Sequence, residues 1–403
     1  MAHKDRITIE QAVSLLIEHA VTKETVTLPL LEAAGFVCAE DVKAKIPQPL
    51  FDRSAMDGYA IHSADLENAS KETPVFLPVS DYLYAGSAPD TALAPGHAVR
   101  IMTGAPIPFG ADCVIPQEIT GCDKNIAVFY QPQAGRSNIC FQGEDIAAGT
   151  LFISRGTRLQ AAQIGLLASQ GISQLCVFRK PKAAVMSTGD ELVPMGAPLL
   201  PGKIYDCNQP MISTRLMELG AQPFPVAPAA DQMDLLCNRI SEALTHCDMI
   251  ITTGGVSVGQ KDLLPEAVQQ LGGKILFHGI AIKPGSPALA AVYQEKLILC
   301  LSGNPFAAAA TFELLGRPVI NFMGGIIPSF PAQCNAVLCS SFSKDSKIRR
   351  FVRAYLSGGK VSIPDACHSS GALRSFADCN CLIDIPAGSP PLHPGETVRV
   401  ILL

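Results

Sequence analysis

Three glycine-containing turns hold the residue types in this sequence that are best suited to chemistry. They read STGDE at 187–191, TTGG at 252–255 and SGNP at 302–305, and each follows or ends a short apolar run. Glycines in such turns let backbone N–H groups approach an anion closely, and a following helix adds a favourable dipole. Carboxylates beside them, here Glu191 and Asp262, are able to hold a hard cation such as Mg²⁺ against a phosphorylated ligand. The three turns therefore indicate a site for a phosphate ester or a nucleotide.

A single turn of this kind is more simply explained as an ordinary connection between a strand and a helix, because unrelated proteins share such folds and turns. The prediction of a site for a phosphate ester or a nucleotide therefore depends on the presence of three such turns with neighbouring carboxylates. The sequence contains neither the P-loop motif of many NTPases nor the glycine fingerprint of dinucleotide-binding dehydrogenases. Those two classes of enzyme are therefore disfavoured.

Three more polar segments precede the turns. Residues 51–60, FDRSAMDGYA, are loop-like, although Asp57 followed by glycine is also typical of a hairpin turn. In RIMTGAPIP, residues 100–108, the prolines would hold the Thr103 hydroxyl in place for an oxyanion. Residues 143–146, GEDI, form an acidic turn. Taken alone, these residues indicate an enzyme or a binding protein that handles phosphate, a divalent cation and an oxyanion.

The elements that position these segments change character along the chain. Thr8 and Gln11 form a capping box ahead of a predicted first helix. Residues 46–150 contain short Val, Ile and Phe runs, which predict a small, mostly β domain. From residue 181 strands alternate with helices, one of them capped by Asp231, so we predict a doubly wound parallel sheet with the three turns at the carboxyl ends of its strands. The C-terminal residues predict a small β-barrel or sandwich.

Composition disfavours several kinds of partner and compartment. The net charge is −5 and no block of Lys or Arg stands out, so we expect no nucleic acid. The 14 cysteines form no C-x-x-C pair and lie mostly in apolar runs, which disfavours zinc and disulfides and favours a reducing, cytoplasmic compartment. Residues 318–343 carry no charge but are interrupted by glycine and proline, so we expect no membrane span. The N-terminal segment lacks the apolar core of a signal peptide.

Seven strings occur in order between residues 51 and 305: FDRSAMDGYAI, RIMTGAPIP, GEDI, STGDELV, TTGGVSVG with Asp262, IAIKPG and LSGNP. In this order they resemble the molybdopterin molybdenumtransferase family, which includes MoeA-type bacterial proteins and the C-terminal domain of gephyrin. The resemblance implies an α/β multidomain chain that forms an elongated homodimer. Its expected parts are an N-terminal helical and linker domain at 1–50 and 147–180, an inserted β-rich domain at 51–146, a doubly wound molybdopterin-binding domain at 181–325 and a C-terminal β-barrel at 326–403.

The resemblance also implies a reaction in which adenylated molybdopterin and molybdate give molybdenum cofactor and AMP, with Mg²⁺. It further implies contacts with other proteins of molybdenum cofactor biosynthesis. The residues implied to act in catalysis are Asp57, Thr103, Asp145, Glu191, Asp231 and Asp262, of which Glu191 and Asp262 would hold the metal. The residues implied to bind substrate are Gly189, Asp190, Gly254, Gly255, Ser257, Lys283, Gly303, Asn304, Pro305 and Ser370.

The chain departs from the family pattern at three places. Residues 140–142 read CFQ where relatives often carry arginines, Ser286 stands where some have a second lysine, and Ser302 stands where a proline is usual. The first two departures remove positive charge near an anionic substrate, so we expect weaker oxyanion binding.

Two alternative functions stay open at this stage. One is transfer of an adenylyl group to molybdopterin, which stand-alone proteins with a similar sheet domain perform; the 51–146 region disfavours it. The other is a non-catalytic pterin-binding scaffold, suggested by the lost basic residues and disfavoured by the acidic set of Glu191, Asp231 and Asp262. The sequence fits molybdenum and tungsten equally.

Overall fold

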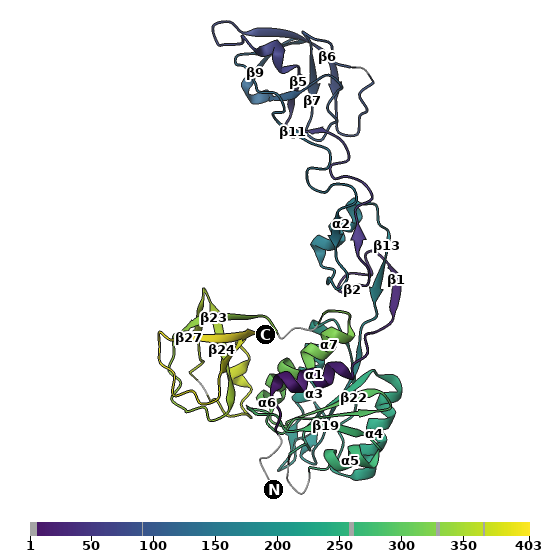
Figure 1. Cartoon of the computed structure of the whole chain (residues 1–403), viewed down its shortest axis with the longest axis vertical. Helices are drawn as coiled ribbons and strands as arrows, with labels where there is room; N and C mark the ends of the chain where they lie inside the picture. Colours follow the sequence, from purple (N-terminus) through teal and green to yellow (C-terminus); the bar gives the residue numbers. More distant parts are fainter. Residues whose placement is uncertain (1–5, 91, 258–261, 328–330, 366) are drawn as a thin grey trace. The chain divides into compact units, whose positions relative to one another are not determined.

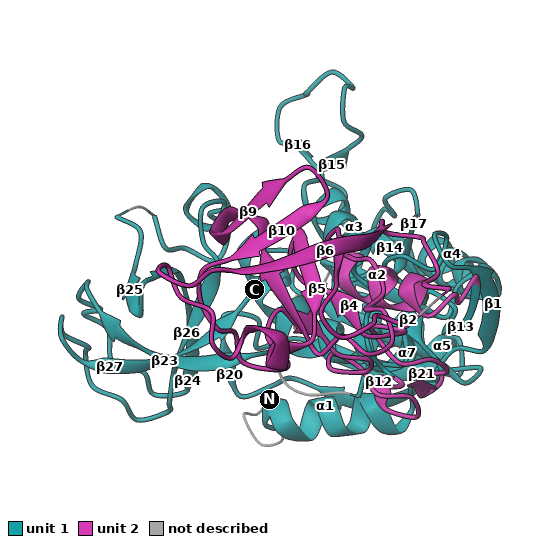
Figure 2. Ribbon diagram, turned by 90° about the horizontal axis from the view of Figure 1, so that it is seen from above, with its two compact units in different colours: residues 1–39, 156–160, 174–403 teal, residues 40–155, 161–173 magenta. Residues whose placement is uncertain are grey.

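The fold is known from a computed structural model, which describes residues 6–90, 92–257, 262–327, 331–365 and 367–403. Val258 and Gly259 of the TTGGVSVG string, and Pro328 of the uncharged stretch, lie outside the described residues. The chain divides into two compact units. In Figure 2, unit 1 (residues 1–39, 156–160 and 174–403) is teal and unit 2 (residues 40–155 and 161–173) is magenta.

Unit 1 begins with the predicted helix, α1 (Ile9–Glu18). The capping box is confirmed, because the Thr8 hydroxyl accepts the Gln11 N–H at 3.2 Å and the Gln11 side chain accepts the Thr8 N–H at 2.9 Å. Further along, a short antiparallel sheet has the order β1 (Thr25–Pro29), β13 (Gln174–Phe178) and β2 (Val37–Cys38).

A six-stranded sheet forms the centre of unit 1. Its order is β17 (Gln222–Pro225), β14 (Lys182–Ser187), β18 (Met249–Thr253), β22 (Lys296–Leu301), β21 (Leu289–Tyr293) and β19 (Lys274–His278). The first four strands are parallel, as the doubly wound prediction requires. The structure adds β21 and β19 as antiparallel strands at one edge. The hairpin from β21 to β22 turns at Gln294 and Glu295, whose positive φ angles of 49° and 61° suit a two-residue hairpin turn.

Helices cover both faces of this sheet (Figure 1). Alternate residues along a strand point to opposite faces, so Ile251 packs in one core and Ile250 in the other. The helices that follow the strands are α3 (Asn208–Glu218), α4 (Met233–His246), α5 (Leu264–Gln270), α6 (Pro305–Thr311), a π-helix (Phe312–Gly316) and α7 (Arg317–Met323).

The prediction that Asp231 caps a helix is wrong. The N-cap of α4 is Gln232, and its side chain makes no capping bond. Instead, the Asp231 N–H donates to Asp190 Oδ1 at 3.1 Å. This bond joins the turn before α4 to the turn after β14.

The C-terminal part of unit 1 is a barrel, one of the two predicted alternatives. Five strands close on themselves because β24 (Arg349–Ser357) pairs with both β25 (Lys360–Ser362) and β26 (Cys381–Ile385). The other two strands of the barrel are β23 (Gln333–Leu338) and β27 (Thr397–Leu402). A sixth strand, β20 (Ile282–Lys283), pairs with β24 but is not part of the closed barrel.

Unit 2 is mostly β-structure, as predicted. Its main sheet has the order β8 (Cys113–Pro116), β5 (Gly58–Ile61), β7 (Ala98–Ile101), β6 (Val75–Leu83), β10 (Ile126–Phe129) and β9 (Thr120–Asp123). Tyr59 meets Phe129 edge-on in its core, with ring centroids 5.9 Å apart. Shorter elements are β4 (Arg53–Ser54) with β11 (Ile139–Cys140), β3 (Val42–Lys43) with β12 (Leu151–Ile153), and α2 (Ala161–Ser169).

Among the residues that the structure describes, no helix has the length and apolarity needed to cross a membrane. The structure describes all 14 cysteines and pairs none of them in a disulfide.

Candidate functional site

A cleft of about 990 Å³ in unit 1 lies where β14, β18 and β22 end. In open α/β sheets, ligands bind at this edge. The predicted residues that line the cleft are Gly189, Glu191, Asp231, Gly254, Gly255, Ser257, Asp262, Lys283, Gly303, Asn304, Pro305 and Ser370. Asp190 is joined to the same wall through its bond to Asp231.

Backbone hydrogen bonds hold the three turns side by side. The Thr188 N–H donates to Thr253 O at 2.8 Å, and the Gly254 N–H donates to Leu301 O at 3.1 Å. The Ser187 and Thr253 hydroxyls lie 3.0 Å apart, which adds a bond between the ends of β14 and β18. The turns are therefore one unit of structure, not three independent loops.

The turns pack so closely that side chains would not fit. A Cβ atom on Gly254 would lie 2.4 Å from Thr188 O, and Gly254 has a φ of 91° that favours glycine. A Cβ atom on Gly303 would lie 3.3 Å from Gly254 Cα. Glycine at these positions lets the turns pack together and lets a ligand approach the backbone closely.

The carboxylate residues that line the cleft are Glu191, Asp206, Asp231 and Asp262. Within the described part of the chain, no group of three His, Cys, Asp or Glu residues is placed to hold a metal ion by itself. Mg²⁺ is usually bound through only one or two carboxylates together with substrate phosphates and water. The donor set in the cleft therefore fits a magnesium ion that arrives with a phosphorylated ligand, and does not fit an all-protein metal cage.

Cationic and hydroxyl groups line the cleft from β20 and the turn after it, from the barrel and from the segment before α1. Lys283, Ser286 and Ser370 line it, and so does Arg6, which the sequence did not suggest. The Ser286 hydroxyl donates to Ile282 O, so its side chain braces the turn that carries Lys283.

A buried arginine brings Ser370 to the cleft. Arg353 donates to Ser369 O at 2.7 Å and to the Ser375 hydroxyl at 2.7 Å, and its guanidinium carbon lies 3.6 Å from the centroid of the Phe306 ring. The Phe306 N–H at the start of α6 donates to Ser370 O at 3.0 Å. These contacts fix the Ser369–Ser375 segment against α6.

Sequence reasoning missed the segment from β16 (Ile204–Tyr205) to the first residue of α3, which lines the cleft with five consecutive residues, 204–208. Asn208 donates from Nδ2 to Gly303 O at 2.8 Å. Asp206 Oδ1 accepts the N–H groups of Asn208 and Gln209 at 3.0 and 3.2 Å. An aspartate just ahead of a predicted helix was the available signal, because such residues cap helices.

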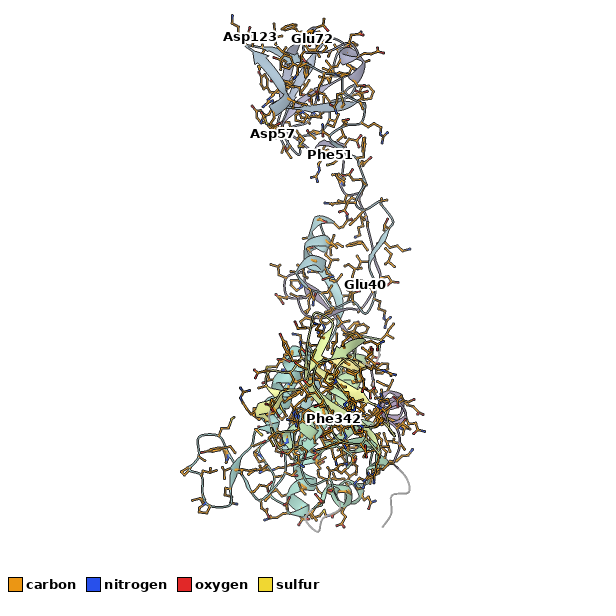
Figure 3. The ribbon with its side chains drawn as sticks, turned by 90° about the vertical axis from the view of Figure 1, so that its left-hand side faces the viewer. Glu40, Phe51, Asp57, Glu72, Asp123 and Phe342 are labelled. Carbon is orange, nitrogen blue, oxygen red and sulfur yellow. The ribbon has the colours of Figure 1, made fainter. Side chains whose placement is uncertain are left out.

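The remaining predicted catalytic residues belong to unit 2. Asp57 Oδ1 accepts both the N–H and the hydroxyl of Thr103, each at 2.7 Å. These two hydrogen bonds lower the pKa of Asp57 below its usual range. The bond from the Thr103 backbone N–H has the larger effect and the bond from the Thr103 hydroxyl the smaller one. In Figure 3, Asp57 and Phe51 lie toward one end of the main sheet of unit 2, and Asp123 lies at its other end. Asp145 lies in the turn after β11, where its N–H donates to Gln48 O at 3.0 Å.

The residues that replace the expected arginines are integrated into unit 2. The Gln142 N–H donates to Asp52 Oδ1 and its Nε2 donates to Leu50 O, both at 2.7 Å. Cys140 pairs with Arg53 across the β4–β11 ladder. A cationic side chain, Arg53, is therefore present beside the segment that lacks the family's arginines.

Comparison with known proteins covers nearly the whole chain. Three family models match in order: the MoeA N-terminal region (domains I and II) at residues 7–171, the probable molybdopterin binding domain at 184–321, and the MoeA C-terminal region (domain IV) at 335–403. The molybdopterin molybdenumtransferase of Staphylococcus aureus (strain MRSA252) is 34% identical over 402 residues, covering 99% of this chain and 96% of the relative. That of Bacillus subtilis (strain 168) is 36% identical over 406 residues, covering 98% and 94%.

Solved structures agree with these matches. A molybdopterin biosynthesis MoeA protein from Pyrococcus horikoshii is 33% identical, with a TM-score of 0.81 and 99% of each chain covered. A second MoeA structure, from Pyrococcus horikoshii OT3, is 28% identical, with a TM-score of 0.85 and coverage of 99% and 100%.

The fold and the cleft together define a multidomain α/β enzyme of molybdenum cofactor biosynthesis. Within that class, the chain belongs to the molybdopterin molybdenumtransferase family, whose members are transferases. The resemblance seen in the sequence is thereby confirmed.

Proposed function

We propose that this protein inserts molybdate into adenylated molybdopterin and releases AMP. The observation that carries the proposal is the single cleft in which three interlocked glycine turns, the carboxylates Glu191 and Asp262, and the cation Lys283 meet. Phosphate, a divalent cation and an oxyanion are the three groups that this reaction must bring together.

Each part of the cleft has a separate task in the proposed reaction. The N–H groups of Gly255 and Gly303, which take no part in the hydrogen bonds between the turns, bind the phosphate groups of the adenylated pterin. Glu191 and Asp262 hold Mg²⁺, which supplies positive charge to the phosphate when it is bound. Lys283 and Ser370 donate hydrogen bonds to the oxygens of molybdate, the second substrate. Asp190 and Asp231 position the wall between the first turn and α4.

Unit 2 contributes to the same reaction through a second copy of the chain. Asp57, Thr103 and Asp145 lie in the 51–146 region, which falls within the match to the MoeA N-terminal region. We therefore propose a homodimer in which each 51–146 region completes the partner's cleft. The four-domain division at 1–50 with 147–180, 51–146, 181–325 and 326–403 belongs to this proposal. Light scattering at micromolar concentration, combined with activity measurements, tests it, and a fully active monomer contradicts it.

A reducing, cytoplasmic setting is part of the proposal because the 14 cysteines, all of them described, form no disulfide. Several of the buried ones, Cys113, Cys300 and Cys381, have a pKa raised to about 12 by burial, which keeps them as unreactive thiols.

A single-turnover assay with purified protein, adenylated molybdopterin, Mg²⁺ and molybdate tests the function directly. We expect AMP and molybdenum cofactor to form in equal amounts. Parallel reactions with tungstate determine which metal the cleft prefers. Formation of adenylated molybdopterin from molybdopterin and ATP would identify an adenylyltransferase instead, and pterin binding without turnover would identify a scaffold.

A further inference from the structure

Asp206 has a carboxylate oxygen without a partner at the wall of the cleft. The residue lines the cleft, yet it is only 7% exposed. Oδ1 accepts two N–H groups at the start of α3, whereas Oδ2 is buried and has no hydrogen-bond partner among the described residues. A buried acceptor without a donor destabilises the protein. This oxygen is therefore expected to find its donor outside the chain.

An aromatic side chain stands next to this oxygen in the sequence. Tyr205 also lines the cleft and is 43% exposed, and its hydroxyl donates to Ala197 O at 2.8 Å. That bond ties the ring to the loop between β15 (Leu192–Val193) and β16, which Figure 2 shows projecting from unit 1. An anchored, partly exposed ring offers a flat surface on which a heterocycle is able to stack.

The charge of Oδ2 excludes one kind of partner. Phosphate and molybdate oxygens are acceptors with negative charge, so a carboxylate repels them. A neutral N–H donor on a flat ring satisfies both the acceptor oxygen and the aromatic surface.

We infer that Tyr205 and Asp206 form a subsite for the amino-bearing heterocycle of the substrate, in which the Tyr205 ring stacks on its face and Asp206 Oδ2 accepts a hydrogen bond from its exocyclic amino group. This inference rests on the proposed function, because adenylated molybdopterin carries two such rings, a pterin and an adenine. In the present conformation Oδ2 is covered, so the donor reaches it through a small shift of the two residues that connect β16 to α3.

The test uses substitutions that separate recognition from folding. Asp206→Asn keeps an oxygen that caps α3, because Asn and Asp are similarly good at helix N-termini, but replaces the acceptor with an N–H₂ donor. Tyr205→Leu removes the ring, and Tyr205→Phe keeps it. Ser213→Ala is the matched control, since Ser213 Oγ on α3 is also buried without a partner but does not line the cleft.

Two probes distinguish the two rings. Binding of 6-hydroxymethylpterin phosphate is followed by pterin fluorescence, which is favoured by the absence of tryptophan from the chain. Binding of AMP is followed by calorimetry. We expect Asp206→Asn and Tyr205→Leu each to weaken the binding of one of these probes by about tenfold or more. Tyr205→Phe and Ser213→Ala should change the affinity for either probe little. The probe that is affected identifies the ring.

One further ligand reverses the direction of the proposed hydrogen bond. The lumazine counterpart of the pterin probe has an oxygen in place of the 2-amino group, so Asp206→Asn should bind it better than wild type does if the ring is the pterin. If wild-type protein binds the probes and both variants bind them equally well, the subsite is wrong and the proposed function is untouched. If wild type binds neither probe, the subsite and the proposed function both fail.

Discussion

The cleft of unit 1 and the Asp57–Thr103 pair of unit 2 hold polar groups in place by different means. In the cleft, interlocked turns from three strands leave no room for a Cβ atom, and contacts from the barrel and from α3 brace them. In unit 2, a single carboxylate on an exposed turn is held by two hydrogen bonds from one threonine. The cleft is therefore sensitive to packing, whereas the unit 2 pair is sensitive to protonation and to local hydrogen bonding.

The largest expected effect comes from the carboxylates of the cleft. Asp262→Ala or Glu191→Ala should slow AMP release by on the order of 10² or more, because charge on the reacting phosphate would lose its compensation. Rates are measured in single turnover at saturating Mg²⁺, and circular dichroism confirms that the fold is intact. Asp234→Ala, in the first turn of α4 and outside the cleft, is the control and should behave as wild type. Unchanged rates in both cleft variants would remove these residues from the mechanism.

Packing of the turns is tested by Gly254→Ala. The left-handed backbone costs about 1–2 kcal/mol for any L-residue, and the clash with Thr188 O adds overpacking of about 1–3 kcal/mol. Gly272→Ala has a similar φ of 82° but nothing within 4 Å of the new Cβ, so only the backbone cost applies. Denaturant unfolding of both variants measures the difference. Equal destabilisation would show that the three turns are not packed as tightly as the distances indicate.

The absence of cationic side chains at residues 142 and 286 should weaken the binding of molybdate more than the binding of the adenylated pterin. One charge-assisted hydrogen bond contributes roughly 1.5–3 kcal/mol, so Gln142→Arg or Ser286→Lys should lower the molybdate concentration needed for half-maximal cofactor formation by about tenfold. Affinity for the adenylated pterin should hardly change, because its phosphate contacts come from the glycine turns. Molybdate titrations of wild type and the two variants decide this. Superimposable curves would mean that Arg53 and Lys283 already compensate.

The smallest effect concerns the Asp57–Thr103 pair and depends on pH. Because the folded-state pKa of Asp57 is lowered, the interaction stabilises the protein above the unfolded carboxyl pKa of about 4 and is lost as the pH falls through the lower folded value. Thr103→Ala should therefore be less stable than wild type at pH 7, and this gap should narrow in acid. Chemical denaturation at pH 7 and pH 3 measures the gap, with Asp57→Asn as the control that lacks the titrating group. A gap that is the same at both pH values would refute this account.

The sequence alone determined those features whose signals are local. The Thr8 capping box, the apolar strands before each glycine turn and the alternation of strands with helices all follow from patterns within a few residues, and the structure confirms them. The glycine turns could be placed at one edge of the sheet because the carboxyl ends of parallel strands meet there.

Only the tertiary structure decided which distant residues share the cleft. Asn208 reaches Gly303, Arg353 positions Ser370 through Ser369, and Asp206 is left with one unused oxygen, none of which a pattern of neighbouring residues reveals. The antiparallel strands β19 and β21 and the N-cap of α4 at Gln232 were also seen only in the structure. The hydrogen bond from Asn208 to Gly303 joins residues 95 positions apart and exists only after the sheet has formed, so the sequence showed the polar groups but not their partners.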